Sequence, residues 1–225
     1  MTPELNKLDE KLVELSKTLF EVKSNLDIHK IISLNSTKMN KIGKGKAFFA
    51  HVQEMCLKSY VLGICKVFEI EKRLELNSLP SILKTAKDCR PKKEQPLINF
   101  INDHKDLFGQ RKEDCGNHPI ADVEKIYQGF YQKYLTKDDR LKKMRDKIVA
   151  HSEYMEDDVR PRNIQSYDLL EKFLFFAIDL HAAINRAYLN VCPHPFKNDK
   201  KVLSSNCRIS EKLGFRNVNT RFDDE

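Results

Sequence analysis

Apolar side chains at the beginning of the chain recur at alternating steps of three and four residues. This spacing places them along one face of an α-helix. Thr2, Pro3 and Glu4 form a helix start, because a hydroxyl caps the first turn, proline suits the first helical position and an acid suits the first turn. We predict a helix from Pro3 to a polar break near Asn35, and we favour packing inside a bundle over a coiled coil. The apolar stripe consists of Leu5, Leu8, Leu12, Leu15, Leu19, Val22 and Leu26.

A second apolar pattern predicts a helix from about Lys46 to Leu74. Gly63 lies inside it, and glycine lowers helix propensity, so we expect a neighbouring helix to approach closely there. Residues 77–80 should cap a short helix that ends near Lys87. The expected core positions of the long helix are Phe48, Val52, Met55, Cys56, Ile64, Val67 and Phe68.

Prolines, glycines and mixed charges interrupt the pattern between residues 88 and 119. We predict a connection there that carries a little helix around Leu97 to Ile101. Helical spacing returns from Ile120 to Leu135. No stretch of the sequence shows the alternation typical of a β-strand.

Two further helices are predicted in the second half of the chain. Thr136 and Asp139 resemble a capping box, which would open a helix from Lys137 to about His151. A long last helix should be central to the core, because Phe175 and Phe176 widen its apolar surface, and it should end at Cys192. Its stripe consists of Leu170, Phe173, Ala177, Leu180, Ile184, Ala187 and Val191.

These elements together predict an all-α fold, a helical bundle with long antiparallel helices, an irregular mid-chain connection and a C-terminal tail. We expect residues 1–191 to form a single helical domain. Residues 192–225 show little periodicity and are expected to form the tail.

Composition and charge reduce the number of protein classes to which the chain could belong. The net charge of +7 and the pI near 9.0 favour anionic partners such as nucleic acid. The longest stretch without Asp, Glu, Lys or Arg runs only from Ala187 to Phe196 and contains two prolines, so no membrane span is expected. An acid, Glu4, lies near the start of the sequence, where a signal peptide needs an apolar run. We therefore expect a cytoplasmic protein.

The cysteines give no sign of a metal site or a disulfide framework. All six are scattered without the spacing of a zinc site, and without an export signal they are expected to be reduced thiols. Cys115 with His118, and Cys192 with His194, each supply only half of the four ligands that a structural zinc site needs. We expect neither a metal nor a cofactor.

The segment around Arg145 carries the main candidate chemistry. On a helical projection Arg145 falls inside an apolar arc and His151 lies at its edge. An always-charged guanidinium in a packing face must find an anion or water. One interpretation is an internal ion pair to a carboxylate such as Glu69 or Asp179, within a plain structural scaffold. The apolar arc consists of Leu141, Met144, Ile148 and Val149.

The sequence Arg-Asp-Lys-Ile-Val-Ala-His, residues 145–151, resembles the signature of the HEPN superfamily: an arginine, four to six residues of which the first is polar, then a histidine. The surrounding helices, over about residues 45–190, resemble its abortive-infection (Abi U-type) branch. The resemblance implies an all-α fold and a metal-independent endoribonuclease, often a phage-defence or toxin hydrolase. It also implies a homodimer in which two Arg/His pairs line one cleft.

By position, the resemblance makes Arg145 the residue that holds the scissile phosphate, a role suited to a planar cation. His151 would move the proton between the ribose 2′-OH and the departing 5′-oxygen. Asp146 matches the polar position and would orient the pair. Some toxin members carry a tyrosine two residues after the histidine; here Ser152 is next and Tyr154 is third, so this chain departs from their pattern.

The partners that follow are RNA, a second copy of the chain and, for a toxin, a neutralising protein partner. The alternative function is a non-catalytic HEPN-like module that binds a nucleotide, RNA or a protein. Basic side chains on the same predicted helix would contact RNA phosphates, although such a face is also typical of plain solvent exposure. The RNA-binding candidates are Arg140, Lys142, Lys143 and Lys147, with Lys137 beside them.

Overall fold

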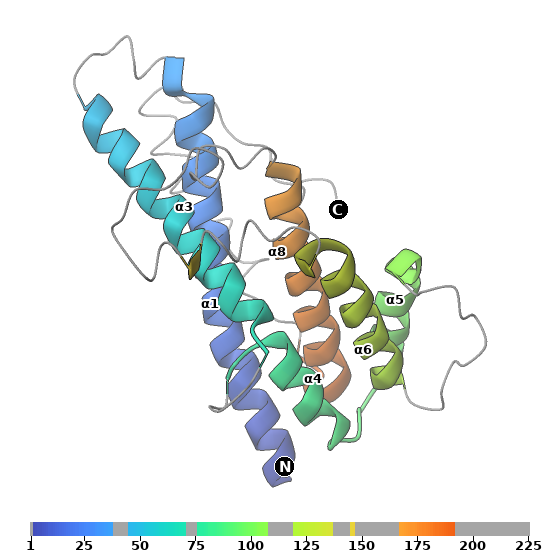
Figure 1. The fold of residues 1–225 in the computed structure, drawn as a ribbon. Helices are drawn as coiled ribbons and strands as arrows, with labels where there is room; N and C mark the ends of the chain where they lie inside the picture. The colour runs from blue at the N-terminus through green and yellow to red at the C-terminus, as the bar shows by residue number, and fades with distance from the viewer. Residues whose placement is uncertain are drawn as a thin grey trace.

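The computed structural model describes residues 2–37, 45–70, 76–107, 119–136, 145–146 and 167–191, and these residues form helices and connections without a strand (Figure 1). The predicted all-α fold is confirmed. Six elements of the described residues are α-helices of two turns or more, and they run antiparallel or cross within one bundle. The elements are α1 (Pro3–Leu34), α3 (Lys46–Phe68), α4 (Leu79–Lys87), α5 (Gln95–Asp103), the 3₁₀ turn η1 (Lys105–Leu107), α6 (Pro119–Phe130), the π-helix η2 (Tyr131–Thr136), α8 (Tyr167–Ile184) and the π-helix η5 (Asn185–Leu189).

Helix α1 begins and ends where the sequence predicts. The Thr2 hydroxyl accepts a hydrogen bond from the Leu5 amide at 3.4 Å, which caps the first turn. The helix stops at Leu34, and the Asn35 side chain donates to the Ile31 carbonyl at 2.8 Å. Every member of the predicted stripe is buried except Leu5, which is partly buried. The stripe therefore faces the core of the bundle.

Helix α3 packs antiparallel to α1 along much of its length (Figure 1). The close approach expected at Gly63 is confirmed, because a Cβ atom there would collide with Cγ2 of Val22. The prediction that this helix reaches Leu74 was wrong. The helix ends at Phe68, since the backbone of Glu69 is extended (φ −67°, ψ 131°), and the Tyr127 hydroxyl donates to the Phe68 carbonyl at 3.4 Å.

The core positions predicted in α3 divide into two groups. Four of them, Cys56, Ile64, Val67 and Phe68, are buried. Phe48 is 64% exposed and Met55 is 48% exposed, so assigning them to the core was wrong, while Val52 is half-buried. The reason is that α3 carries apolar residues on two sides, and only one side packs against the bundle.

The middle of the chain follows the prediction with small shifts. The short helix α4 ends at Lys87 as expected. The little helix in the connection is longer than predicted, because α5 spans Gln95–Asp103. The helix expected from Ile120 to Leu135 is present, but its last part is the wider π-helix η2.

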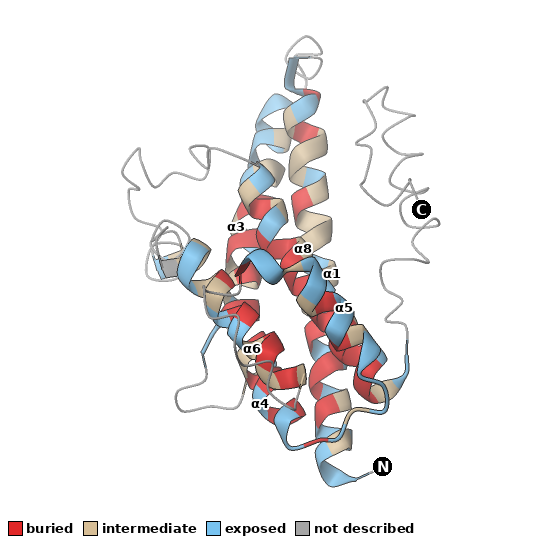
Figure 2. Ribbon diagram, turned by 90° about the vertical axis from the view of Figure 1, so that its right-hand side faces the viewer, coloured by how far each residue is buried: buried red, intermediate tan, exposed pale blue. Residues whose placement is uncertain are grey.

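Helix α8 occupies the centre of the bundle, as its apolar surface predicts (Figure 2). Phe176 stacks on Phe130 of α6 with ring centroids 3.8 Å apart and planes within 7°. The helical path ends at Asn190, whose φ of 60° breaks it before Cys192, and Val191 is 52% exposed rather than buried as expected.

No helix in the described ranges has the length and apolarity needed to cross a membrane. The predicted C-terminal tail, residues 192–225, lies outside the described residues, as does most of the helix predicted from Lys137 to His151.

Candidate functional site

Arg145 and Asp146 are the two residues of the predicted signature that the structure describes, and both are helical. The Arg145 guanidinium donates from Nε and from Nη2 to the same carboxylate oxygen, Oδ1 of Asp146, at 2.9 and 2.6 Å. The Arg145 side chain is 32% exposed. A guanidinium has five N–H donors, and among the described residues the pair with Asp146 uses only Nε and one hydrogen of Nη2.

The two residues lie beside the C-terminal end of α3, where Cys65 and Glu69 share one face because they are a single turn apart (Figure 1). The hydrogen bond that Arg145 donates to Asp146 raises the pKa of Arg145, burial acts against this rise, and the charges at Asp146, Cys65 and Glu69 add to it. Arg145 therefore stays charged while it is partly shielded from water.

Cys65 responds to the same group of charges. Burial raises the pKa of its thiol to about 11, the Arg145 charge acts against this, and Asp146 and Glu69 raise it further. The thiol is therefore protonated near neutral pH, and it is a poor candidate for a nucleophile because the thiolate is the reactive form.

Between Arg145 and the described carboxylates of the core helices, the structure shows no buried ion pair of the kind that a scaffold would need. Asp179 is 59% exposed on its side chain and lies 3.8 Å from Nε2 of His104. Glu69 is exposed, and within the described ranges its side chain makes no hydrogen bond or ion pair. Arg145 instead pairs with its own neighbour in sequence, and within the described residues it forms no ion pair with Glu69 or Asp179, the two carboxylates that the scaffold interpretation offered as examples.

The other site candidates lie outside the described residues. These are His151, Ser152, Tyr154, Arg140, Lys142, Lys143 and Lys147, together with Lys137. Their roles stay predictions from the sequence.

Sequence reasoning missed the face of α3 whose charges act on Arg145. Cys65 appeared only as one of the scattered thiols, and Glu69 only as a candidate buried partner. Their spacing of four residues showed that they share a face, but no local pattern could show that Arg145, far away in sequence, would reach it.

Two further contacts hold the parts of the bundle that support this face. The Tyr60 hydroxyl donates to the Leu170 carbonyl at 2.6 Å, which ties α3 to the first turn of α8. Lys30 of α1 pairs with Glu171 of α8 at 2.5 Å. Both contacts lie near Cys65. The charges of Cys65 and of Glu171 both raise the pKa of Tyr60, which places the three side chains in one region of the bundle.

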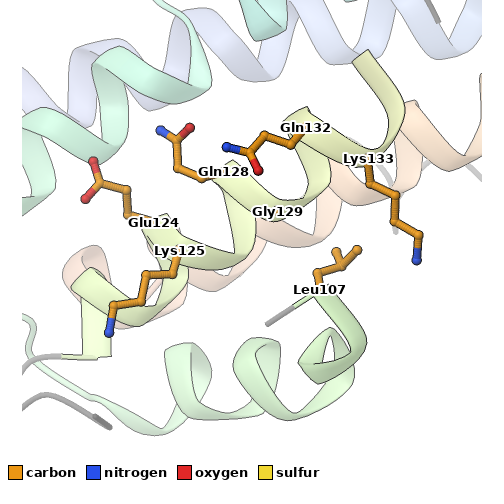
Figure 3. A pocket seen from close by; sticks show the side chains of 7 residues that line it. All are labelled: Leu107, Glu124, Lys125, Gln128, Gly129, Gln132 and Lys133. Atoms are coloured by element: carbon orange, nitrogen blue, oxygen red, sulfur yellow. The ribbon is translucent and has the colours of Figure 1, made fainter. Parts of the chain in front are cut away.

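A separate, open groove of about 750 Å³ runs along α6 and η2 (Figure 3). Leu107 approaches so closely that a Cβ atom on Gly129 would collide with its carbonyl oxygen. Two lining lysines face acids, Lys125 with Asp122 at 3.0 Å and Lys133 with Asp106 at 3.8 Å. The lining residues are Leu107, Glu124, Lys125, Gln128, Gly129, Gln132 and Lys133.

The part of the chain that the structure describes contains no group of three or more His, Cys, Asp or Glu side chains that could hold a metal ion. The candidate site thus consists of a half-shielded arginine, the carboxylate that holds it, and the α3 face opposite. Such a site can bind an anion that reaches the Nη1 end of the guanidinium.

Comparison with known proteins assigns the family. The model of the HEPN family AbiU2 matches residues 5–206. No curated protein and no solved structure matches the chain. Since the match covers most of the sequence, the chain belongs to the AbiU2 family of HEPN proteins.

Proposed function

We propose that this protein is a metal-independent endoribonuclease of the HEPN type that acts in phage defence or as a toxin. The observation that carries the proposal is the state of Arg145: it is held from one side by Asp146, it is only half-shielded, and within the described residues its guanidinium hydrogen-bonds through Nε and Nη2 to this one carboxylate oxygen. Membership of the AbiU2 family supports the same function.

Arg145 holds the scissile phosphate with the Nη1 end of its guanidinium. A planar cation with parallel N–H donors matches two phosphate oxygens, and it stabilises the negative charge that grows on them in the transition state. Asp146 restricts the side chain before RNA binds, so less freedom is lost on binding.

His151 moves the proton. The ribose 2′-oxygen attacks phosphorus as His151 takes its proton, the bond from phosphorus to the 5′-oxygen breaks, and the proton passes to that 5′-oxygen. The products are a 2′,3′-cyclic phosphate and a 5′-hydroxyl end. Histidine suits this role because its ordinary pKa of about 6.5 lies near working pH.

The Cys65 thiol near the site does not act as a nucleophile in place of the ribose 2′-oxygen. The high pKa of Cys65 keeps it neutral near pH 7, so it neither attacks phosphorus as a thiolate nor repels the phosphate. Arg140, Lys142, Lys143 and Lys147 supply further phosphate contacts around the cleft.

The test is to incubate the pure protein with total RNA in EDTA and to identify the ends of the products. We expect cleavage that survives the chelator and leaves cyclic phosphate and 5′-hydroxyl ends. His151→Ala, purified identically, is the matched control for a contaminating nuclease and should be inactive. Binding of RNA without cleavage by the wild-type protein would instead favour the non-catalytic HEPN module.

A further inference from the structure

A tyrosine with two lysines beside it lies on the surface where η2 meets α8. Nζ of Lys172, from α8, lies 4.8 Å from the centroid of the Tyr134 ring, and Nζ of Lys133 lies 5.3 Å from it. The tyrosine is half-buried, and both lysines are exposed. We call these three residues the tyrosine cluster. The fold brings them together because η2, the continuation of α6, lies beside α8 (Figure 1).

The core of the bundle holds the ring of Tyr134 in place. Its centroid lies 5.0 Å from that of Phe130, which is buried and stacks on Phe176 of α8. The tyrosine belongs to a π-helix, a rare element that is frequent at functional sites. The ring is therefore positioned before any ligand arrives, so little conformational freedom is lost when a ligand binds.

The two ammonium groups are held only weakly. Lys133 lies 3.8 Å from Asp106, and their side chains are 49% and 69% exposed, so this ion pair contributes little. Among the described residues, the contact of Lys172 is the one with the Tyr134 ring. Two positive charges beside one ring also repel each other, and a phosphate placed near both removes this repulsion.

This combination of groups matches a single strand of RNA. Unpaired bases stack on aromatic rings, and such a stack is stronger than a cation–π contact at an exposed site. A base therefore replaces an ammonium group over the ring, and the flexible lysine side chain moves to a phosphate. An acidic peptide would use the lysines but not the ring, so the tyrosine favours nucleic acid over protein.

The tyrosine cluster lies on the same part of the bundle as the candidate site. Phe130, whose ring contacts Tyr134, also stacks on Phe68 with centroids 5.8 Å apart. Phe68 is the last residue of α3, and it precedes Glu69, whose charge acts on Arg145. Two ring contacts thus connect the tyrosine to the end of α3 beside the arginine, and one strand of a few nucleotides can contact both.

The groove along α6 and η2 gives the strand a path away from the tyrosine cluster. Lys133 lines one end of this groove, and Gln128 and Gln132 line it on successive turns (Figure 3). Amide side chains both donate and accept hydrogen bonds, which suits the edges of unpaired bases. Because the groove is open, it suits a strand that runs along the surface better than an enclosed small molecule.

We infer that the tyrosine cluster is a second RNA-binding subsite, in which one base of a single strand stacks on Tyr134 and the phosphates beside that base pair with Lys133 and Lys172. The inference deepens the proposed function and rests on it for the identity of the ligand as RNA, but it does not require cleavage. A base must be unpaired to stack on the ring. The subsite therefore selects unpaired RNA and determines which phosphate reaches Arg145.

The first test measures binding of an unpaired RNA oligomer with 2′-O-methyl riboses, which lacks the attacking hydroxyl and stays intact. Tyr134→Leu keeps an apolar side chain against Phe130 but loses the ring, so affinity should fall about tenfold, the size of one lost base stack. Tyr134→Trp should keep the affinity. Tyr131→Leu is the matched control, because Tyr131 is also a half-buried tyrosine of η2 but its ring packs on Tyr127, and it should bind like the wild type.

The second test separates the base from the phosphates. Oligomers that lack one base at a time should bind the wild-type protein less tightly at one position, and Tyr134→Leu should remove that loss, since the two changes delete the same contact. Lys172→Gln should lower the slope of log affinity against log salt by about 0.7, the value for one phosphate of a single strand. Lys17→Gln, at an exposed lysine of α1, is the charge control and should leave the slope unchanged.

The third test uses the wild-type protein alone and so does not depend on how a variant folds. Ultraviolet light should cross-link an oligomer that contains 5-iodouridine to the stacked tyrosine. Trypsin cuts after Lys133 and Lys137, so the label should appear on the peptide of residues 134–137. Cross-links confined to other peptides would overturn the subsite.

Together these measurements separate the inference from the proposed function. A protein that cleaves RNA while Tyr134→Leu binds as tightly as the wild type keeps the function and loses the subsite. A protein that binds RNA through Tyr134 but never cleaves it keeps the subsite and ends the proposed catalysis. If Tyr134→Leu lowers the urea midpoint without changing RNA affinity, the cluster only joins η2 to α8 and the inference is wrong.

Discussion

Arg145 is held by the residue next to it in the chain: Nε and Nη2 of its guanidinium both donate to one oxygen of Asp146, at 2.9 and 2.6 Å. The pair sits at the end of α3 and is partly open to solvent. A neighbouring carboxylate of this kind restrains the arginine without burying it. It thereby keeps the cation available for an anion that arrives from outside.

Asp146→Asn should reduce cleavage without removing it. The amide oxygen still accepts a hydrogen bond, but the charge that strengthens the bond is lost, and hydrogen bonds to charged groups are worth about 1.5–3 kcal/mol. We expect kcat/KM to fall by about tenfold, and Asp146→Ala to fall further. Single-turnover cleavage of a short RNA measures this; a wild-type rate in Asp146→Ala would show that the carboxylate does not position Arg145.

Arg145→Ala should damage both cleavage and RNA binding, whereas His151→Ala should abolish cleavage and leave binding nearly intact. The difference follows because a phosphate contact acts before and during the reaction, while a proton carrier acts mainly in the transition state. Fluorescence anisotropy with a labelled RNA, beside a cleavage gel, measures the two effects. Equal losses of binding in both variants would contradict these roles.

The same Arg145→Ala variant tests how much the arginine stabilises the fold. Its pair with Asp146 is partly exposed, so we expect a loss of less than about 1 kcal/mol in the free energy of unfolding. An arginine in a buried ion pair would instead give a loss of about 3–5 kcal/mol. Urea unfolding of the two proteins decides between these values.

Gly63→Ala should destabilise the protein although alanine favours helices. The new Cβ meets the buried Val22 side chain between α3 and α1, and overpacking a core costs about 1–3 kcal/mol, more than the roughly 1 kcal/mol gained in helix propensity. Adding Val22→Ala should return part of the loss. A double-mutant cycle on thermal melts checks this, and strict additivity of the two changes would show that the residues do not touch.

The stability of the fold should fall as the pH drops below about 6.5. His181 is buried, Nε2 lies 2.9 Å from the Leu12 carbonyl, and burial lowers the pKa of His181 from its ordinary value of 6.5. The unfolded chain then binds the proton more readily than the folded one, so protonation favours unfolding between 6.5 and the lower folded pKa. His29, also with a lowered pKa, adds to the slope.

Urea unfolding at a series of pH values from 7.5 downwards measures this slope. His181→Gln should flatten it while lowering stability at pH 7.5, because the new side chain does not titrate and fits the site less well. A slope that survives the substitution unchanged would assign the acid sensitivity to other groups.

RNA affinity should fall steeply with salt if the lysines beside Arg145 contact phosphates. Replacing Lys142 and Lys143 with glutamine should reduce the slope of log affinity against log salt by about two or somewhat less. Titrations at several salt concentrations measure it. An unchanged slope would move the binding surface elsewhere, for example to the basic residues of the C-terminal segment.

Local patterns determined most of the helices of this protein. The stripe of α1, its cap at Thr2 and its end near Asn35 follow from spacing and side-chain chemistry within a few residues, and the structure has them where the sequence predicts. The central place of the last helix follows from its wide apolar surface in the same way. The short signature around Arg145 also pointed to the family, because that resemblance is carried by residues close together in the chain.

Tertiary contacts decided where α3 ends, which of its sides α1 covers and what lies near Arg145, because the spacing of apolar residues does not determine these features. Apolar residues continue past Phe68, yet α3 ends there, where Phe68 packs against rings of α6 and α8 and Tyr127 bonds its carbonyl. Both sides of α3 are apolar, so spacing could not tell which one α1 would cover. That the charges of Cys65 and Glu69 would act on Arg145 depended on how a segment remote in sequence packs beside α3. The physical reason is shared: periodicity reports which residues of one helix share a side, but only packing between helices fixes what lies opposite that side.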